Sequence, residues 1–228
     1  IFKIDGQSYT YCLKQSLPAL KVAKVWNAPI DRVYAEIAWL KLAAAIVPGC
    51  VPQIFGVDRQ TNSFVMSFLS PDAFPNWKSE LLAGRVDLPF AAAVGGMLAR
   101  IHSATANREE VRRNFANDDD FLALRLDPYL LETAERHPDL AEKLRALVIR
   151  TQTQKLALVH GDISPKNILV GPSGPVFLDA ECAWYGDPAF DIAFCLNHLL
   201  LKSVAYRNVS ASLLEAFDAL ASAYLSSV

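Results

Sequence analysis

Three short apolar runs in the second half of the chain limit most strongly the fold that this sequence can adopt. They lie at residues 156–159, 168–170 and 176–178. Apolar runs of this length between polar and Gly/Pro-rich segments are typical of short buried strands. The polar residues where these strands end or begin are Asp162, Asn167 and Asp179, in the strings VHGDISPKNILV and LDAE. Because the strands follow one another closely, the sequence predicts that these three side chains converge on one point.

This set of residue types indicates phosphoryl transfer. Two carboxylates and an amide carbonyl are hard oxygen ligands, which suit Mg²⁺ better than Zn²⁺. In phosphoryl transfer a divalent cation neutralises the phosphates, and a carboxylate orients the attacking hydroxyl and accepts its proton. The protein must also supply a cation for the phosphates. Lys14, at the end of a predicted strand, is the candidate, and Glu36 on the following predicted helix would hold it by an ion pair.

The other hydrophobic patterns predict a strand-rich first part and a helical second part. In the first part we expect strands at 2–4, 9–14, 51–57 and 64–69 and a helix at 31–46. In the second part we expect helices at 90–101, 128–134, 140–149, 190–202 and 213–224. The last of these begins with Ser212 and Glu215 at capping-box spacing. The sequence therefore predicts an α+β fold of two lobes, with a small β-rich lobe over 1–70 and a larger helical lobe over 71–228.

Composition excludes several classes of protein. An apolar fraction of 52% with 20% charged residues is ordinary globular usage. A protein with a net charge of -2 lacks the basic field that nucleic-acid binding needs, and this charge slightly favours a cationic ligand.

The longest nearly uncharged run, 90–99, has about half of the ~20 residues of a membrane span. The four cysteines match no metal or disulfide pattern, so we expect reduced thiols in a cytoplasmic protein without a nucleic-acid or membrane partner. Nothing indicates the oligomeric state.

The HGDISPKN string at 160–167 and the LDAE string at 178–181 resemble the aminoglycoside phosphotransferase and choline kinase family. This family shares its fold with the protein kinases. The resemblance runs through nearly the whole chain and extends to methylthioribose kinase. The other segments that carry it are 14–15, 17–18, Glu36, 51–52, 77–78, 185–188 and 190–192. The HGDxxxxN string with the later DxE is typical of the superfamily and does not specify a substrate.

The resemblance implies a role for each residue of the predicted site. Asp162 would be the catalytic base, while Asn167 and Asp179 would bind Mg²⁺. Lys14 would contact the phosphates of ATP, with Glu36 as its partner. These roles describe a bilobal, protein-kinase-like fold with nucleotide between the lobes.

The resemblance also implies an adenine site and a support for the catalytic loop. Adenine would bind the backbone groups of Ser67 and Leu69, with Met66 beside its ring. Asp191 would be a structural residue that braces the loop. From the residue type alone, His160 is a buried, hydrogen-bonded residue that shapes the loop more often than a general base.

Glu181 is open to two interpretations from the sequence. It either supports a second metal ion or faces the substrate, or it is a surface carboxylate.

Two features depart from the family pattern. No Gly-rich phosphate loop precedes Lys14, where only Gly6 occurs, and the chain opens at Ile1 within a strand-like run. We therefore expect a truncated small lobe whose phosphate-covering loop is missing from this chain. Methylthioribose kinase does not keep the Asn that this chain has at Asn167, which favours the broader phosphotransferase group.

The sequence thus predicts an ATP-dependent kinase that moves the γ-phosphate of ATP to a hydroxyl of a small molecule, such as an aminoglycoside, an amino alcohol or a sugar. The missing phosphate loop leaves the alternative of a catalytically inactive, nucleotide-binding pseudokinase. A metal-dependent hydrolase using the same carboxylates is a third interpretation, which gives no reason for a Lys14–Glu36 pair.

Overall fold

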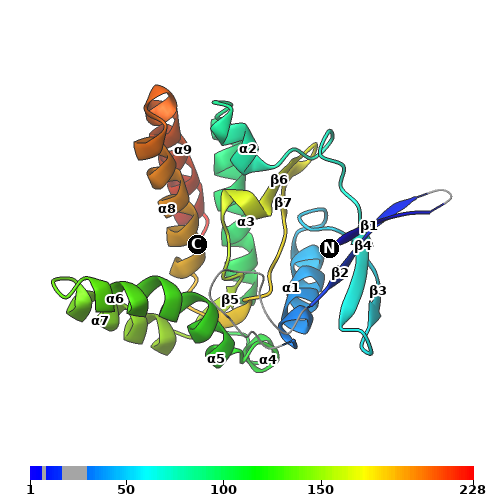
Figure 1. The fold of residues 1–228 in the computed structure, drawn as a ribbon, viewed down its shortest axis with the longest axis horizontal. Helices are drawn as coiled ribbons and strands as arrows, with labels where there is room; N and C mark the ends of the chain where they lie inside the picture. Colours follow the sequence, from blue (N-terminus) through cyan, green and yellow to red (C-terminus); the bar gives the residue numbers. More distant parts are fainter. Residues whose placement is uncertain (7–8, 17–29) are drawn as a thin grey trace.

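A computed structural model describes residues 1–6, 9–16 and 30–228. A four-stranded antiparallel sheet and one helix precede a mainly helical part that carries two small two-stranded sheets (Figure 1). This architecture confirms the predicted α+β class. The pair 17–18, which belongs to the resemblance, lies outside the described residues.

The N-terminal sheet joins two antiparallel hairpins side by side. Its strands, in order of pairing, are β1 (Phe2–Asp5), β2 (Thr10–Gln15), β4 (Ser63–Ser67) and β3 (Ile54–Asp58). In this register Lys14 is opposite Phe64. The helix α1 (Arg32–Ile46) follows, and its residues Ile37 and Leu40 belong to the same buried cluster as Phe64. These elements are those that the patterns before residue 70 predict, with strand ends shifted by a few residues.

The remainder consists mainly of helices. They are α2 (Trp77–Leu82), α3 (Leu88–Thr105), α4 (Glu109–Asn114), α5 (Asp118–Phe121), the π-helix η1 (Leu122–Leu131), α6 (Glu132–Arg136), α7 (Ala141–Thr153), the short 3₁₀ turns η2 (Pro165–Asn167) and η3 (Arg207–Val209), α8 (Ala189–Ala205) and α9 (Ser210–Leu225). Among the described residues, no helix combines the length and apolar character needed to cross a membrane.

Two helix starts were wrongly predicted. Pro128 does not open a helix but lies inside η1, which continues directly into α6. The helix α9 begins at Ser210 and has no side-chain cap, so the spacing of Ser212 and Glu215 is not a capping box. In both cases the local signal falls inside a longer helical element.

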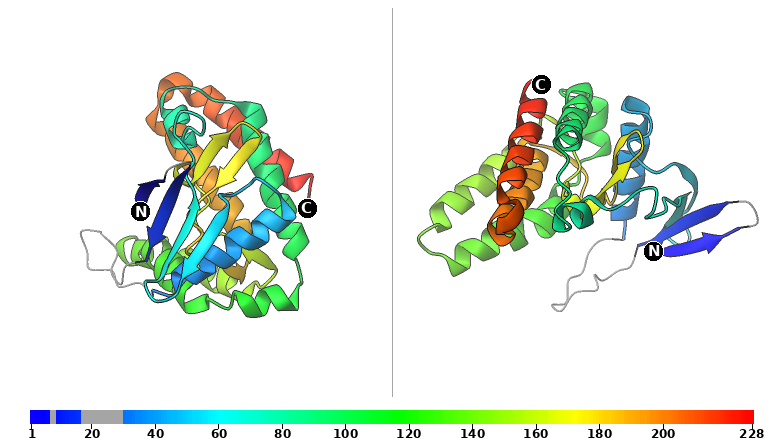
Figure 2. Two further views of the ribbon diagram at one scale, coloured as in Figure 1. Left: turned by 90° about the vertical axis from the view of Figure 1, so that its right-hand side faces the viewer. Right: turned by 90° about the horizontal axis from the view of Figure 1, so that it is seen from above.

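The short strands of the second part form two separate pairs. β6 (Ile168–Gly171) and β7 (Gly174–Phe177) form a hairpin, whereas β5 (Ala157–Val159) pairs with β8 (Trp184–Gly186). The sequence does not predict β8, because three residues are too few to show an alternating pattern. The β6–β7 hairpin lies between the N-terminal sheet and the helices α8 and α9 (Figures 1 and 2).

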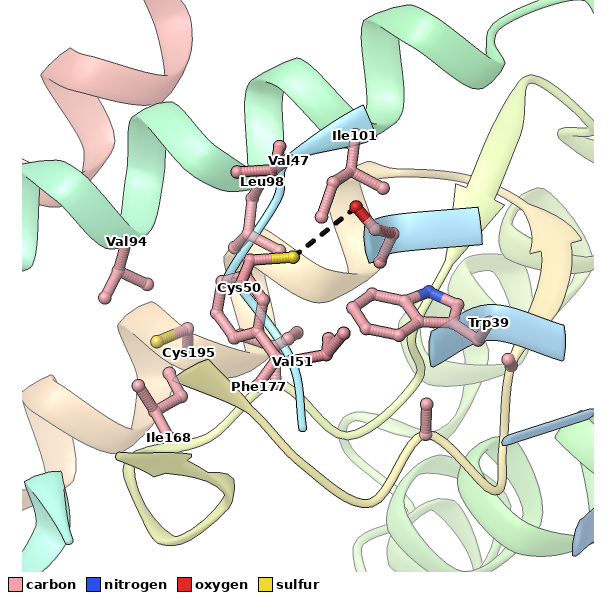
Figure 3. Packing of buried hydrophobic residues seen from close by; sticks show 14 of the residues in the cluster. Trp39, Val47, Cys50, Val51, Val94, Leu98, Ile101, Ile168, Phe177 and Cys195 are labelled. Atoms are coloured by element: carbon pink, nitrogen blue, oxygen red, sulfur yellow. Dashed lines mark hydrogen bonds between the residues drawn. The ribbon is translucent and has the colours of Figure 1, made fainter. Parts of the chain in front are cut away.

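One continuous apolar core connects the N-terminal elements to the helices. The connection after α1 carries Cys50, which is buried against Leu98 and Phe177 (Figure 3). The Cys50 thiol donates to the carbonyl of Ala43, and the Cys50 carbonyl accepts from the Phe177 N–H at 2.8 Å. All four cysteines are free, as predicted.

The helices α3 and α9 approach each other closely at Gly95. A Cβ atom at this position would lie 2.2 Å from the carbonyl oxygen of Leu220, closer than any real contact. A Cβ at the neighbouring Gly96 would meet nothing within 4 Å. The missing side chain at Gly95 is therefore what lets the two backbones pack together.

Replacing each glycine by alanine tests this contact. We expect Gly95→Ala to lower the free energy of unfolding by roughly 1–3 kcal/mol, because the helices must separate. Gly96→Ala is the matched control, and it should raise the free energy of unfolding by about 0.5–1 kcal/mol, since alanine is the better helix former. Urea denaturation of both variants measures the difference. Equal effects of the two substitutions would contradict the close approach.

Candidate active site

The loop after β5 begins with a sharp turn that requires glycine. Gly161 has φ +81°, and a Cβ there would lie 2.6 Å from the carbonyl oxygen of Cys182. The N–H groups of His160 and Gly161 donate to the carboxylate of Asp191, at 2.7 and 2.9 Å. Asp191 lies in the first turn of α8 and is completely buried. These contacts favour the supporting role that the resemblance implies for Asp191.

His160 connects this loop to the strand end that carries Asp179. Its Nδ1 accepts from the Asp162 N–H at 3.2 Å, so Nε2 is the donor to the Leu178 carbonyl at 3.1 Å. The ring packs edge-on against Trp39. Burial lowers the pKa of His160, although the carboxylates of Asp191 and Asp162 oppose this. The imidazole is therefore neutral and both of its nitrogens are used, which favours a structural role.

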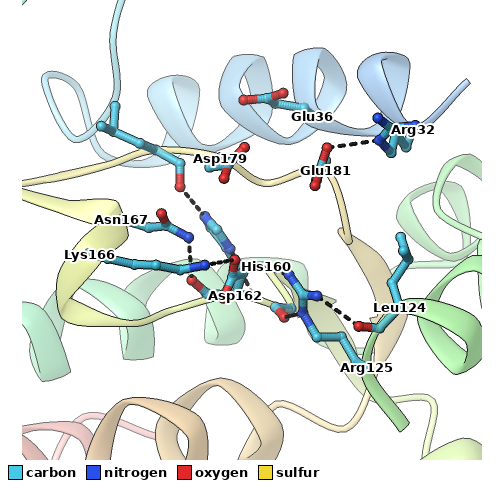
Figure 4. Close-up of polar contacts among 12 residues, drawn as sticks. Arg32, Glu36, Leu124, Arg125, His160, Asp162, Lys166, Asn167, Asp179 and Glu181 are labelled. Atoms are coloured by element: carbon cyan, nitrogen blue, oxygen red, sulfur yellow. Dashed lines mark hydrogen bonds and ion pairs between the residues drawn. The ribbon is translucent and has the colours of Figure 1, made fainter. Parts of the chain in front are cut away.

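The carboxylate of Asp162 is buried and faces two cations (Figure 4). Its Oδ2 lies 3.0 Å from Nη2 of Arg125 and 3.1 Å from Nζ of Lys166. The amide nitrogen of Asn167 donates to the backbone carbonyl of Asp162 at 3.0 Å. This bond orients the Asn167 side chain and places its amide oxygen on the side of Asp179 (Figure 4).

Lys14, on the N-terminal sheet, forms one ion pair with α1 and a second one with the helical part of the chain. Its ammonium lies 2.8 Å from Oε1 of Glu36 and also contacts the carboxylate of Asp179. Burial acts to lower the pKa of Lys14, but Glu36 and Asp179 outweigh it and raise the pKa. Burial likewise acts to raise the pKa of Asp179, but Lys14 outweighs it and lowers the pKa. The predicted Lys14–Glu36 pair is thus present, and it extends to Asp179.

Five of the predicted residues line one cavity of about 150 Å³. They are Lys14, Glu36, Met66, Asn167 and Asp179. Asp162 does not line this cavity, but the Asn167 amide connects it directly to the cavity wall. The structure therefore brings the predicted site residues together. They come from four separate segments: β2, α1, the HGDISPKN loop and the LDAE segment.

The cavity has donors that suit Mg²⁺. The described residues contain no group of three or more His, Cys, Asp or Glu side chains arranged to hold a metal. Mg²⁺, however, typically takes only one or two protein ligands and completes its shell with phosphate oxygens and water. The Asn167 amide and the Asp179 carboxylate fit this mode. Of the two carboxylates at the Lys14 ammonium, Asp179 has a lowered pKa and is the anionic donor, whereas burial raises the pKa of Glu36 to about 7.

The predicted adenine residues are only partly brought to the cavity. Met66 lines it, whereas Ser67 and Leu69 do not. The Ser67 N–H donates to the Gln53 carbonyl at 2.9 Å, and its hydroxyl accepts from the Gln53 N–H. The Ser67 N–H, one of the backbone groups predicted to bind adenine, is therefore already used by Gln53.

Glu181 has a protein partner. Its carboxylate accepts from Nε of the buried Arg32, at 2.9 Å. The sequence leaves open a metal or substrate role and a surface carboxylate, and neither interpretation includes this pair with a buried arginine.

Two residues of the site were not assigned from the sequence. Lys166 lies inside the HGDISPKN string, so a cation four residues after the predicted base was a visible signal. Arg125 comes from η1, 37 residues before Asp162, and nothing in its own segment distinguishes it from a surface arginine. Only the folding of η1 against the loop shows its position.

In this architecture a lysine of the sheet, paired with a glutamate of α1, faces an Asp/Asn loop of a helical part, and this defines a kinase-like fold. Residues 4–226 match the phosphotransferase enzyme family, and the chain belongs to this family. The chain is similar to methylthioribose kinase from Bacillus cereus. The two are 27% identical over an alignment of 242 residues, which covers 94% of this chain and 61% of that protein. The chain thus spans less than two thirds of the length of this relative.

Two solved structures share the fold at low sequence identity. Choline kinase LicA from Streptococcus pneumoniae matches with a TM-score of 0.53 and 13% identity, over 99% of this chain and 78% of that one. The aminoglycoside phosphotransferase APH(2″)-IIa, solved in a ternary complex with streptomycin and ATP, matches with a TM-score of 0.50 and 12% identity, over 99% of this chain and 80% of that one. At these identities the likeness shows the fold alone.

The neutral state of His160 predicts a pH dependence of stability. The folded state resists protonation of this histidine, whereas the unfolded chain binds a proton below about pH 6.5. The free energy of unfolding should therefore fall as the pH drops from 7.5 to 5.5, by up to about 1.4 kcal/mol per pH unit from this group.

Urea denaturation at the two pH values measures this loss for the wild type and for His160→Gln. Gln keeps a donor for the Leu178 carbonyl but does not titrate, so the variant should lose less stability than the wild type. Groups such as Glu36 and His198 titrate in both proteins and cancel in the comparison. The same loss in both proteins would contradict a neutral, buried His160.

Proposed function

We propose that this protein is an ATP-dependent kinase for a small molecule that carries a hydroxyl group. The observation that supports this most is the joint placement of the Lys14–Glu36 pair, Asp179 and Asn167 around one cavity, with the Asp162 loop bonded to its wall. The names of the relatives, methylthioribose kinase and choline kinase, agree with this class of reaction. The ATP of the streptomycin complex belongs to a protein of the same fold.

In this proposal each charged group has one task. When ATP binds, the Lys14 ammonium exchanges its contact with Asp179 for one with the phosphates, and Glu36 keeps the Lys14 ammonium in place. Asp179 and Asn167 would hold Mg²⁺, which neutralises phosphate charge when bound. Asp162 orients the acceptor hydroxyl and accepts its proton. We also propose the division into a nucleotide-binding part over 1–70 and a catalytic part over 71–228.

The pseudokinase alternative has no support from the side chains that the structure describes. The residues needed for metal binding, phosphate binding and proton transfer are all present. All of them line the cavity except Asp162, whose backbone carbonyl accepts a hydrogen bond from Asn167 in the cavity wall. The alternative rests only on the phosphate loop, about which the described residues say nothing.

The charges around Asp162 favour an acceptor that carries an anionic group. Lys166, 53% exposed, lies at its carboxylate. On α8, the charges of Asp162 and Lys166 act on the half-buried His198, but burial lowers its pKa. The positive charge of this helix segment is therefore that of Lys202. The Lys202 ammonium donates to the His198 carbonyl at 3.3 Å. Burial lowers the pKa of Lys202, and the nearby charge of Lys78 adds to this. The ammonium groups of Lys166 and Lys202 would repel a cationic acceptor and attract a carboxylate or phosphate. We therefore propose an acidic hydroxy compound, contrary to the cationic ligand that the net charge favours.

Substitution of the proposed base tests the reaction. Asp162→Asn should lower kcat by about 10²–10⁴-fold, because the amide cannot accept the proton of the hydroxyl. Nucleotide affinity should stay close to the wild-type value, since Asp162 does not line the nucleotide cavity. Coupled ADP release and a nucleotide titration measure the two quantities. Asp72→Asn, at an exposed carboxylate, is the control. Unchanged phosphate transfer in Asp162→Asn would overturn the mechanism.

The proposed acceptor charge predicts an order of substrates. Among hydroxy compounds of matched size, kcat/KM should be highest for a carboxylate, lower for a neutral sugar and lowest for an amino alcohol. The preference for the carboxylate should weaken at high salt, because counterions screen exposed charges. It should also weaken in Lys202→Met but not in the control Lys143→Met, an exposed lysine on α7. A preference for the amino alcohol would contradict the proposal.

A further inference from the structure

The guanidinium of Arg125 is buried between η1 and the loop that carries the proposed base. Only 8% of the residue is exposed. Its Nε donates to the Gly161 carbonyl at 2.5 Å, its Nη1 donates to the Leu124 carbonyl at 2.8 Å, and its Nη2 lies 3.0 Å from Oδ2 of Asp162. One side chain thus holds both the turn of the loop and the carboxylate that follows it (Figure 4).

The backbone around Arg125 is fixed on the same apolar cluster as the strand that leads into the loop. This cluster consists of Phe121, Leu126, Val148, Val159 and Trp184. The rings of Phe121 and Trp184 stack with centroids 4.0 Å apart. Because the cluster contains both the residue after Arg125 and the residue before His160, it sets the distance between the guanidinium and the loop.

The helix that presents Arg125 is itself unusual. η1 is a π-helix of ten residues with Pro128 inside it. Wide helical turns of this kind are rare and occur frequently at functional sites. A buried guanidinium is costly unless each of its contacts is satisfied, so its retention at this position needs a reason.

The other cation at Asp162 differs in each of these respects. Lys166 reaches the same oxygen atom, but its side chain is 53% exposed and it belongs to the same loop as the base. A flexible, solvated ammonium cannot fix the orientation of a carboxylate, whereas the planar guanidinium holds several acceptors in a rigid geometry. Arg125 therefore connects the base to a separate and rigid part of the fold.

We propose that Arg125 is a positioning residue for phosphate transfer. It holds Oδ2 of Asp162 and the Gly161 carbonyl, and so leaves Oδ1 of Asp162 to orient the acceptor hydroxyl. This inference rests on the proposed function. It assigns the role to an arginine outside the HGDISPKN and LDAE strings.

A mutant cycle with the base tests this role. We expect Arg125→Met to lower kcat by about 10²-fold, since small displacements of a catalytic group have effects of this size. KM for ATP should change less than threefold. In the Asp162→Asn background, Arg125→Met should have no further effect on kcat, because no proton acceptor remains to be positioned. A merely structural role would lower kcat by the same factor in both backgrounds, and that result would overturn the inference.

Two further variants keep the test decisive if Arg125→Met folds poorly. Arg125→Lys retains the charge but not the rigid set of donors, so kcat should recover only in part. Full wild-type kcat in Arg125→Lys would show that charge alone suffices and would overturn the positioning role. Arg85→Met removes an arginine from an exposed ion pair with Glu80 and should leave kcat unchanged.

The failure of this inference can be distinguished from failure of the proposed function. If the wild type transfers no phosphate to acidic, neutral or basic hydroxy compounds, the proposed function fails and takes the inference with it. If the wild type turns over and Arg125→Met keeps its kcat, only the positioning role is overturned.

Discussion

A completely buried carboxylate, that of Asp191, holds the loop on which the rest of the site depends. It accepts the N–H groups of His160 and Gly161 and also lies 3.2 Å from Nε2 of His102. A carboxylate out of contact with water is costly unless such donors satisfy it. The first turn of α8 and the loop after β5 are therefore stable only together, and every later contact of the loop starts from this fixed point.

From that point the loop reaches the two other parts of the site through neutral hydrogen bonds. His160 connects it to the strand end before Asp179, and Asn167 connects the Asp162 backbone to the cavity wall. The ion pairs of the site lie beyond these connections, at Lys14 and at Asp162. Neutral contacts that need specific geometry thus place charged groups whose mutual attraction alone would not define an arrangement.

The carboxylates on the two sides of the site have different charge environments. Asp179 and Glu36 share the Lys14 ammonium, and burial raises the pKa of Glu36 to about 7, so Asp179 is the anionic group that a divalent cation would meet on this side. Asp162 instead faces both a guanidinium and an ammonium on a single oxygen atom. Phosphoryl transfer needs such an asymmetry, because a metal ion is held on one side of the site and a hydroxyl is activated on the other. It also means that the preferred charge of the acceptor depends on the local charge near Asp162 and not on the net charge of the chain.

The sequence by itself determined the α+β class, most helices and strands, and the chemical types gathered in the HGDISPKN and LDAE strings, because these depend on local periodicity and on spacing within short segments. It also predicted the Lys14–Glu36 pair, although the contact spans two elements. Only the tertiary structure decided that Asp179 joins this pair, that Glu181 meets Arg32, and that Arg125 lies at the proposed base. These contacts join residues 165, 149 and 37 positions apart. No local pattern encodes which distant side chains meet, since the packing of the cores sets their distances. The length and identity of β8 and η1 were decided in the same way, by what packs around them.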